Sequence, residues 1–305
     1  MLLQRLLRKL KRVVRFSLGW FICRLPFFEK YKLHLLSTWH DYNKRSAMDN
    51  YWFPCLFEAW IPLEYLREKN PDTRERLKGL AMGGNSGKLW AMGYDQGSMD
   101  LAEKVGHLTI GEARPIYQEV ERLCRDSSND LVVIQIGSSS GKEIAYYAAN
   151  YPHQQYIGVD IYEEVIAYAA SAHPLKNLSF RLCSAKAIAS LLTAYQQRKV
   201  LLFSSGSLQY VQPEHLSEFF DAIHRHANAQ IVLCETANES QGAPDQLKKS
   251  LWRGNFAYSH DYKHYAEQAG IHTVACQIIR PFVPYEDFPM HRNTVHYFYH
   301  GKSHF

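Results

Sequence analysis

The sequence has no apolar run long enough to cross a membrane. The nearest candidate, residues 16–23, is roughly half of the ~18 residues that a spanning helix needs, and Arg24 and Pro26 follow it. No long apolar core followed by a small-residue cleavage site marks a secretory leader. We therefore expect a cytoplasmic chain without a spanning helix.

Closely spaced cysteines are also lacking. The six cysteines form no C-x-x-C pair, and no group of His and Cys has the spacing of a zinc site. Three of them lie in apolar runs, where a buried free thiol is the usual state. The pattern fits a reducing compartment, and no metal site is predicted. The three are Cys183, Cys234 and Cys276.

Acidic residues are scarce at the start of the chain. Residues 1–45 carry eleven basic and two acidic side chains, a net charge of +9, whereas the remaining residues sum to −4. The basicity is thus local, and we expect no nucleic-acid-binding body. Residues 2–15 place Leu and Val on one face of a helix and Arg and Lys on the other. Residues 2–25 are interpreted as a peripheral anchor on the inner face of a membrane, or as a helix packed on the rest of the chain.

The sequence predicts three regions. Residues 1–45 form the basic amphipathic tail, residues 46–112 an aromatic-rich helical or irregular extension, and residues 113–305 the main domain. The aromatic segment 51–60 is interpreted as a lid over a site, or as the core of the N-terminal region. The oligomeric state is not predicted.

From residue 131 onward, short apolar runs alternate with helical windows. Such alternation predicts βαβ units and a parallel sheet. Two final runs without a helix between them predict an antiparallel pair at one edge. The apolar runs are 131–137, 155–160, 178–183, 199–204, 229–235, 271–279 and 293–300, and the helices are expected at 113–126, 142–151, 162–172, 185–197, 213–227 and 259–269.

A glycine turn follows the first of these strands. Gly137-Ser-Ser-Ser-Gly141 separates a buried strand from a helix, and such a turn lets a ligand approach the backbone and the helix N-terminus. About twenty residues later, a second strand ends at Asp160. In Rossmann-like folds a carboxylate there accepts the ribose hydroxyls, while the alternative is that Asp160 caps the following helix.

Two other nucleotide motifs are missing. A phosphate-binding loop of the Walker type needs four residues between its glycine and Gly-Lys-Ser/Thr, but three separate Gly137 from Gly141 and Glu143 follows Lys142. The middle glycine of the dinucleotide fingerprint is Ser139 here. Both observations disfavour ATP hydrolysis and NAD binding.

The ordered motifs resemble those of class I S-adenosylmethionine-dependent methyltransferases over about residues 115–300. They are Gln135-Ile-Gly137-Ser-Ser-Ser-Gly141, Gly158-Val-Asp160, Cys183-Ser-Ala185, Phe203-Ser-Ser-Gly-Ser-Leu-Gln-Tyr-Val211 and Ile231-Val-Leu-Cys-Glu235. The resemblance implies a Rossmann-like α/β fold, with a seven-stranded, mostly parallel sheet whose last strand is antiparallel, preceded by a helical N-terminal extension. It also implies S-adenosylmethionine as the cofactor.

The resemblance implies a cofactor site as well. The turn at 137–141 would hold the methionine part, Asp160 the ribose, and Ser184 and Ala185 the adenine, while residues 204–207 would line the methyl-transfer chamber. The full cofactor set is Gln135, Gly137, Ser138, Ser139, Gly141, Asp160, Ile161, Ser184, Ala185, Ser204, Ser205 and Gly206. The family often has an acid at position 135 and usually a glycine at 139, where this chain has Gln and Ser.

Methyl transfer needs an aligned nucleophile, exclusion of water and sometimes a proton acceptor. The candidates for these roles are Glu235, Tyr210 and His260. The Asn/Asp-Pro-Pro-aromatic signature of amino-group methylation is absent, which favours O-methylation of a small molecule, lipid or glycan. A catalytically inactive scaffold and an RNA methyltransferase that uses the basic tail remain as alternatives.

Overall fold

The computed structural model describes residues 64–82, 114–127, 130–238, 250–254, 256–279 and 294–303, with the isolated positions 14, 17, 21, 25–27, 61, 87, 91 and 92. Almost all of the basic tail, the aromatic segment 51–60 and most of residues 83–112 lie outside the described residues. Within the described ranges, no helix has both the length and the apolar character needed to cross a bilayer.

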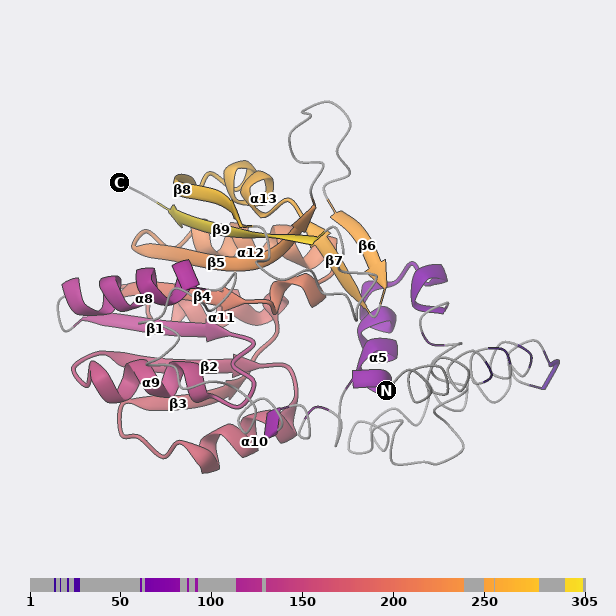
Figure 1. Ribbon diagram of the computed structural model, residues 1–305, viewed down its shortest axis with the longest axis horizontal. Helices are drawn as coiled ribbons and strands as arrows, with labels where there is room; N and C mark the ends of the chain where they lie inside the picture. Colours follow the sequence, from indigo (N-terminus) through magenta and orange to yellow (C-terminus); the bar gives the residue numbers. More distant parts are fainter. Residues whose placement is uncertain are drawn as a thin grey trace, which may run out of the picture. The chain divides into compact units, whose positions relative to one another are not determined.

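A seven-stranded sheet organises residues 131–303 (Figure 1). Its strand order is β3-β2-β1-β4-β5-β9-β8. The first five strands are mutually parallel, and β9 runs antiparallel to both β5 and β8. The expected α/β fold with an antiparallel last strand is confirmed. The strands are β1 Leu131–Ile136, β2 Gln155–Asp160, β3 Leu178–Leu182, β4 Lys199–Ser205, β5 Ala229–Asn238, β8 His272–Ile279 and β9 Thr294–Lys302.

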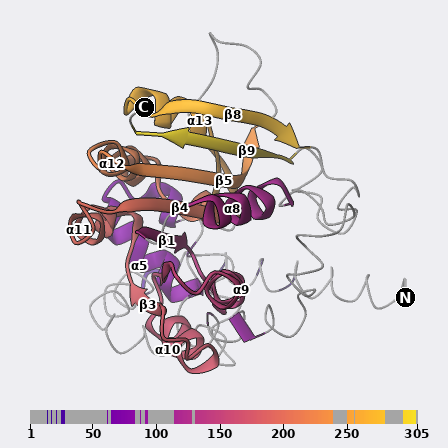
Figure 2. The same cartoon turned by 90° about the vertical axis from the view of Figure 1, so that its left-hand side faces the viewer.

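Helices cover both faces of this sheet, as the turned view in Figure 2 shows. On one face, α8 (Arg114–Asp126) and α9 (Lys142–Asn150) pack on the central strands, and α10 (Glu163–Ala172) packs against β2 and β3. On the other face lie α11 (Ile188–Thr193), α12 (Pro213–His224) and α13 (Tyr262–Gln268).

The alternation of side chains along β1 explains the two layers. Val132, Ile134 and Ile136 belong to the buried cluster under α11 to α13, whereas Leu131 and Val133 belong to the cluster under α8 and α9. All six residues of β1 are buried. A strand buried on both faces is a nearly continuous apolar run in the sequence, broken in β1 by Gln135, which is why the sequence predicted it.

Two expected helices differ from the structure. The window 185–197 is a 3-10 turn, η2 (Ala185–Ala187), followed by the short helix α11. The window 259–269 is wrong at its start, because α13 begins at Tyr262 and its N-cap is Asp261, whose side chain accepts from the backbone N–H of His264. Ser259 and His260 instead end strand β7 (Ala257–His260), which pairs with β6 (Ser250–Gly254).

The chain divides into two compact units, residues 1–92 with 254–256, and residues 93–253 with 257–305. In the first unit, α5 (Pro71–Met82) starts after Asn70, whose side chain accepts from the backbone N–H groups of Asp72 and Thr73. The buried rings of Tyr65 and Phe256 meet edge to face in the same unit, with centroids 5.2 Å apart. The sheet and its helices form the second unit.

Candidate active site

The turn after β1 has an unusual backbone. Gly137, Ser139 and Gly141 have φ angles of 67°, 48° and 80°, in the left-handed region. The turn is fixed by Ser138 N–H, which donates to Val159 O (2.8 Å), and it ends where Gly141 caps α9. Glycine adopts these angles without strain, but serine does not. The turn therefore holds Ser139 in a conformation that its side chain disfavours.

The two glycines are required by neighbouring packing. A Cβ on Gly137 would overlap Ser207 Oγ, which donates to Gly137 O (3.3 Å). A Cβ on Gly141 would lie 2.5 Å from the ring of Phe180 on β3. Both glycines therefore let the turn after β1 lie directly against its neighbours, the loop after β4 and strand β3.

Asp160 lies at the end of β2 beside this turn. Its Oδ2 accepts from Ser139 N–H (3.2 Å), and its Oδ1 accepts from Ile161 N–H (2.8 Å) and Tyr162 N–H (3.4 Å). Burial raises the pKa of Asp160, and the three N–H groups oppose this rise. Asp160 does not act as the helix cap, because α10 has Tyr162 at its N-cap.

The surroundings of Asp160 fit a ribose and an adenine. A carboxylate has about four acceptor sites, so three backbone donors leave about one on Oδ2 for a hydroxyl. Two apolar side chains flank the carboxylate at the ends of β2 and β3, with Ile161 40% and Leu182 60% exposed. Ser184 accepts from Ala187 N–H (3.3 Å) and so caps η2, while Ala185 packs on the core.

The turn itself offers unused polar groups. The buried hydroxyl oxygens of Ser138 and Ser139 have no hydrogen-bond partner among the described residues. Buried polar atoms normally have partners, so such hydroxyls are suited to a polar ligand. The structure thus brings together the cofactor residues expected at the ends of β1 and β2. Their polar groups fit a cofactor whose polar part would lie against the turn 137–141.

Gln135 lies in β1, just before the turn, and it contacts Glu143, an acid to which the sequence analysis gave no role. Its Nε2 donates to Glu143 Oε2 (2.7 Å), and Glu143 Oε1 accepts from the Tyr117 hydroxyl. All three side chains are buried. A carboxylate at position 135 would lie against that of Glu143 and repel it, which gives a physical reason for glutamine here. Glu143 resembles an ordinary acid in a first helical turn, so its sequence position gives no signal.

Glu235 organises the loop after β4. It is fully buried and accepts from Ser204 Oγ (2.6 Å) and from the backbone N–H groups of Ser207 (3.0 Å), Leu208 (3.1 Å) and Gln209 (3.3 Å). Burial raises the pKa of Glu235 to about 7 despite these four donors. The carboxylate of Glu235 on β5 thus fixes the loop that contains Ser205 and Gly206, at the carboxyl end of β4.

Tyr210 lies in η3 (Leu208–Tyr210), at the end of this loop, and is half-buried. Burial raises the pKa of its phenol, so the group is protonated at neutral pH. The half-buried guanidinium of Arg253 on β6 is close enough to lower the same pKa. Tyr210 and Glu235 therefore lie in one cluster with Arg253, a residue to which the sequence analysis gave no role.

His260 has both ring nitrogens engaged inside the fold. Its Nε2 lies 3.0 Å from the carbonyl oxygen of Val211, and its Nδ1 lies 2.7 Å from Ser250 Oγ. Because a carbonyl only accepts, Nε2 carries the proton and Nδ1 accepts from Ser250. Burial lowers the pKa of His260 to about 3. The imidazole is therefore neutral at physiological pH.

Among the described residues, no group of three or more His, Cys, Asp or Glu side chains has a geometry that could hold a metal ion.

Comparison with known proteins identifies the family of the central region. Residues 133–230 match the protein-family model of a methyltransferase domain. No curated protein matches the chain. The match, the strand order and the paired turn and acid agree with the class I methyltransferase fold that the sequence resembles.

Several solved methyltransferases have similar structures. Geranyl diphosphate C-methyltransferase from Streptomyces coelicolor A3(2) is 10% identical, with a TM-score of 0.44 over 66% of this chain and 88% of that chain. Magnesium protoporphyrin IX methyltransferase from Synechocystis is 12% identical, with a TM-score of 0.44 over 70% and 89%. An O-methyltransferase from a Brevibacillus brevis polyketide synthase is 8% identical, with a TM-score of 0.45 over 62% and 72%. Similarity at this level does not reveal the acceptor of this chain.

Proposed function

We propose that the chain transfers the methyl group of S-adenosylmethionine to an oxygen of a small molecule, lipid or glycan. The observation that carries this proposal is the position of Asp160 and the loop 204–209 at the same carboxyl edge of the sheet, where the ends of β1, β2 and β4 meet. Ligands of open α/β folds bind at this edge. The absence of an Asn/Asp-Pro-Pro-aromatic signature supports an oxygen acceptor over an amino group.

The cofactor supplies an activated methyl group, so the protein has to orient the acceptor and exclude water. We assign Glu235 and His260 to positioning, since their polar atoms are engaged by the loop after β4 and by Val211. Tyr210 is the candidate that contacts the acceptor, because its half-buried phenol follows that loop directly.

Transfer from methyl-labelled S-adenosylmethionine tests the proposal. The chain would be offered hydroxylated aromatics, hydroxylated lipids, glycans and RNA, and the labelled product would be tested for an O-methyl linkage. Label in a hydroxylated acceptor supports the proposal. Label in RNA alone contradicts it and favours the RNA methyltransferase, while cofactor binding without transfer to any acceptor favours the scaffold.

We further propose that residues 2–25 bring the chain to a membrane. The amphipathic pattern of this segment and its net positive charge support binding to anionic lipid. The test is co-sedimentation with vesicles of phosphatidylserine and phosphatidylcholine, for the full chain and a variant without residues 1–25. Equal sedimentation of both chains would contradict the proposal.

A further inference from the structure

A cluster of one cation and two phenols lies beside the loop after β4. Arg253 comes from β6, Tyr210 from η3 and Tyr262 from the first turn of α13. Tyr210 directly follows Gln209, whose Oε1 accepts from Arg253 Nη1 (3.4 Å). The ring of Tyr262 meets that of His260, with centroids 5.4 Å apart, and His260 Nε2 lies 3.0 Å from Val211 O. Burial raises the pKa of both phenols, and the charge of Arg253 opposes this rise. Neither the family match nor the cofactor site gives Arg253 or Tyr262 a role.

The side-chain amide of Gln209 joins Arg253 to the loop after β4. Gln209 Nε2 donates to Gly206 O (2.6 Å), so its Oε1 is the atom that accepts from Thr236 Oγ1 (3.2 Å) and from Arg253 Nη1 (3.4 Å). The amide orientation is thereby fixed. The guanidinium is consequently held next to the loop in which the acceptor atom would react.

Tyr262 supplies an unused donor to the same cluster. Its side chain is fully buried, and its hydroxyl has no hydrogen-bond partner among the described residues. Burial raises the pKa of Tyr262 far above its ordinary value, so the hydroxyl is protonated and can donate. A buried hydroxyl without a partner is costly unless a ligand or water accepts from it.

These donors match an oxyanion. A guanidinium presents five N–H donors in a planar fork that suits carboxylate and phosphate oxygens, and partial burial strengthens such contacts. We infer that the methyl acceptor carries a carboxylate or phosphate group, which Arg253 binds together with the hydroxyls of Tyr262 and Tyr210. The inference rests on the proposed methyl transfer.

The test is calorimetric titration of the full chain saturated with S-adenosylhomocysteine. The probes are benzoate, inorganic phosphate and, as a neutral analogue of benzoate, benzamide. We expect at least one anion to bind with a Kd of about 1 mM and benzamide not to bind. Benzoate alone would indicate a carboxylate on the acceptor, and phosphate alone a phosphate, and either result supports the inference.

Matched variants separate the site from general charge. Arg253→Gln should weaken anion binding at least about tenfold, whereas the exposed control Arg225→Gln should leave it unchanged. Tyr262→Phe should weaken it by about two- to tenfold without lowering the melting temperature, because the hydroxyl has no partner to lose among the described residues. This second variant keeps the test informative if Arg253→Gln does not fold.

Three results would overturn the inference: equal binding of benzoate and benzamide, no saturable binding of either anion, or an affinity that neither Arg253→Gln nor Tyr262→Phe changes. Failure of S-adenosylhomocysteine itself to bind would instead contradict the proposed function. The anion titrations would then be run on the chain alone, where the same comparison of variants decides the inference.

Discussion

Ser139 combines an unusual backbone conformation with a place in the candidate cofactor site. Its φ of 48° directs its N–H toward Asp160 Oδ2, at 3.2 Å. The resemblance to class I methyltransferases implies glycine here, and an L-residue in this region is disfavoured by about 1–2 kcal/mol. The serine is thus retained with local strain, while its buried hydroxyl remains without a partner among the described residues.

Ser139→Gly should therefore stabilise the fold. The relief of about 1–2 kcal/mol is partly offset by the greater freedom of glycine in the unfolded chain, which leaves a gain of about 0.5 kcal/mol in the free energy of unfolding. Urea denaturation measures this gain. Ser140→Gly is the matched control and should destabilise, because the hydroxyl of Ser140 is buried and accepts from Lys142 N–H (3.4 Å). Equal effects of both substitutions would contradict the account.

Glu235 makes stability depend on pH. Its pKa is about 7 in the folded chain and near the ordinary 4.5 when unfolded. Between these values the folded state binds more protons, so the free energy of unfolding should fall as pH rises from about 5 to 7, by up to about 1.4 kcal/mol per pH unit. Denaturation of the wild type and of Glu235→Gln at several pH values measures this. The substitution should flatten the profile, and an unchanged slope would refute the assignment.

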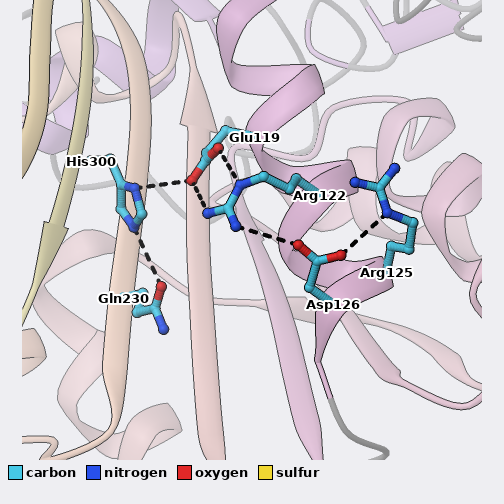
Figure 3. Close-up of polar contacts among 6 residues, drawn as sticks. All are labelled: Glu119, Arg122, Arg125, Asp126, Gln230 and His300. Carbon is cyan, nitrogen blue, oxygen red and sulfur yellow. Dashed lines mark hydrogen bonds and ion pairs between the residues drawn. The ribbon is translucent and has the colours of Figure 1, made fainter.

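At the scale of elements, a polar network holds α8 on the sheet (Figure 3). The buried ring of His300 on β9 has its Nδ1 3.1 Å from Glu119 Oε1 of α8 and its Nε2 3.3 Å from Gln230 Oε1 of β5. Glu119 also pairs with Arg122, which reaches the exposed Asp126. Because α8 also carries Tyr117, the network helps to place the helix beside the cofactor turn.

Glu119→Gln should lower the free energy of unfolding by about 1–3 kcal/mol, because it weakens a contact to a buried imidazole. Asp126→Asn alters the exposed end of the same network and should cost less than about 1 kcal/mol. Chemical denaturation of both variants tests this order. A larger loss for Asp126→Asn would show that the helix is held by its exposed charges.

The elements also show how far the sequence predicts the fold. The strands from 131 to 238 and most helices were predicted, because runs buried on two faces and helical periodicity are properties of contiguous residues. The number of strands and the antiparallel last strand were implied by the resemblance, whereas the order of the strands depends on long-range pairing and was not predicted. The β6–β7 pair was missed, since β7 has four residues, all buried, and shows no alternation. The Gly254-Asn255 dipeptide is the turn signal that could have revealed it.

The same distinction applies to the site. Asp160 and the glycine turn are contiguous motifs, so the sequence located them. The hydrogen bonds of Gln135 with Glu143 and of Gln209 with Arg253 join residues on different elements. No spacing rule predicts such pairs, because the side-chain directions depend on the packing of the whole domain.

At the scale of the molecule, the candidate site draws on residues from 135 to 262, contributed by strands β1 to β7 and the segments that follow them. Binding of the cofactor therefore tests the fold and the site together. The ribose contact is the most specific part of the account, because Asp160 combines a remaining acceptor site with a fixed position beside the turn.

The most direct test is calorimetric titration of S-adenosylmethionine and S-adenosylhomocysteine into the wild type, Asp160→Asn, Asp160→Ala and the exposed control Asp126→Asn. One hydrogen bond to a charged group is worth about 1.5–3 kcal/mol, so Asp160→Ala should raise the Kd by about ten- to a hundredfold, while the control leaves it unchanged. Asp160→Asn keeps the shape of the side chain, so a loss of binding in this variant would not be due to a loss of folding. Micromolar binding to the wild type that collapses in both Asp160 variants is the predicted result, and no binding to the folded wild type would contradict the account.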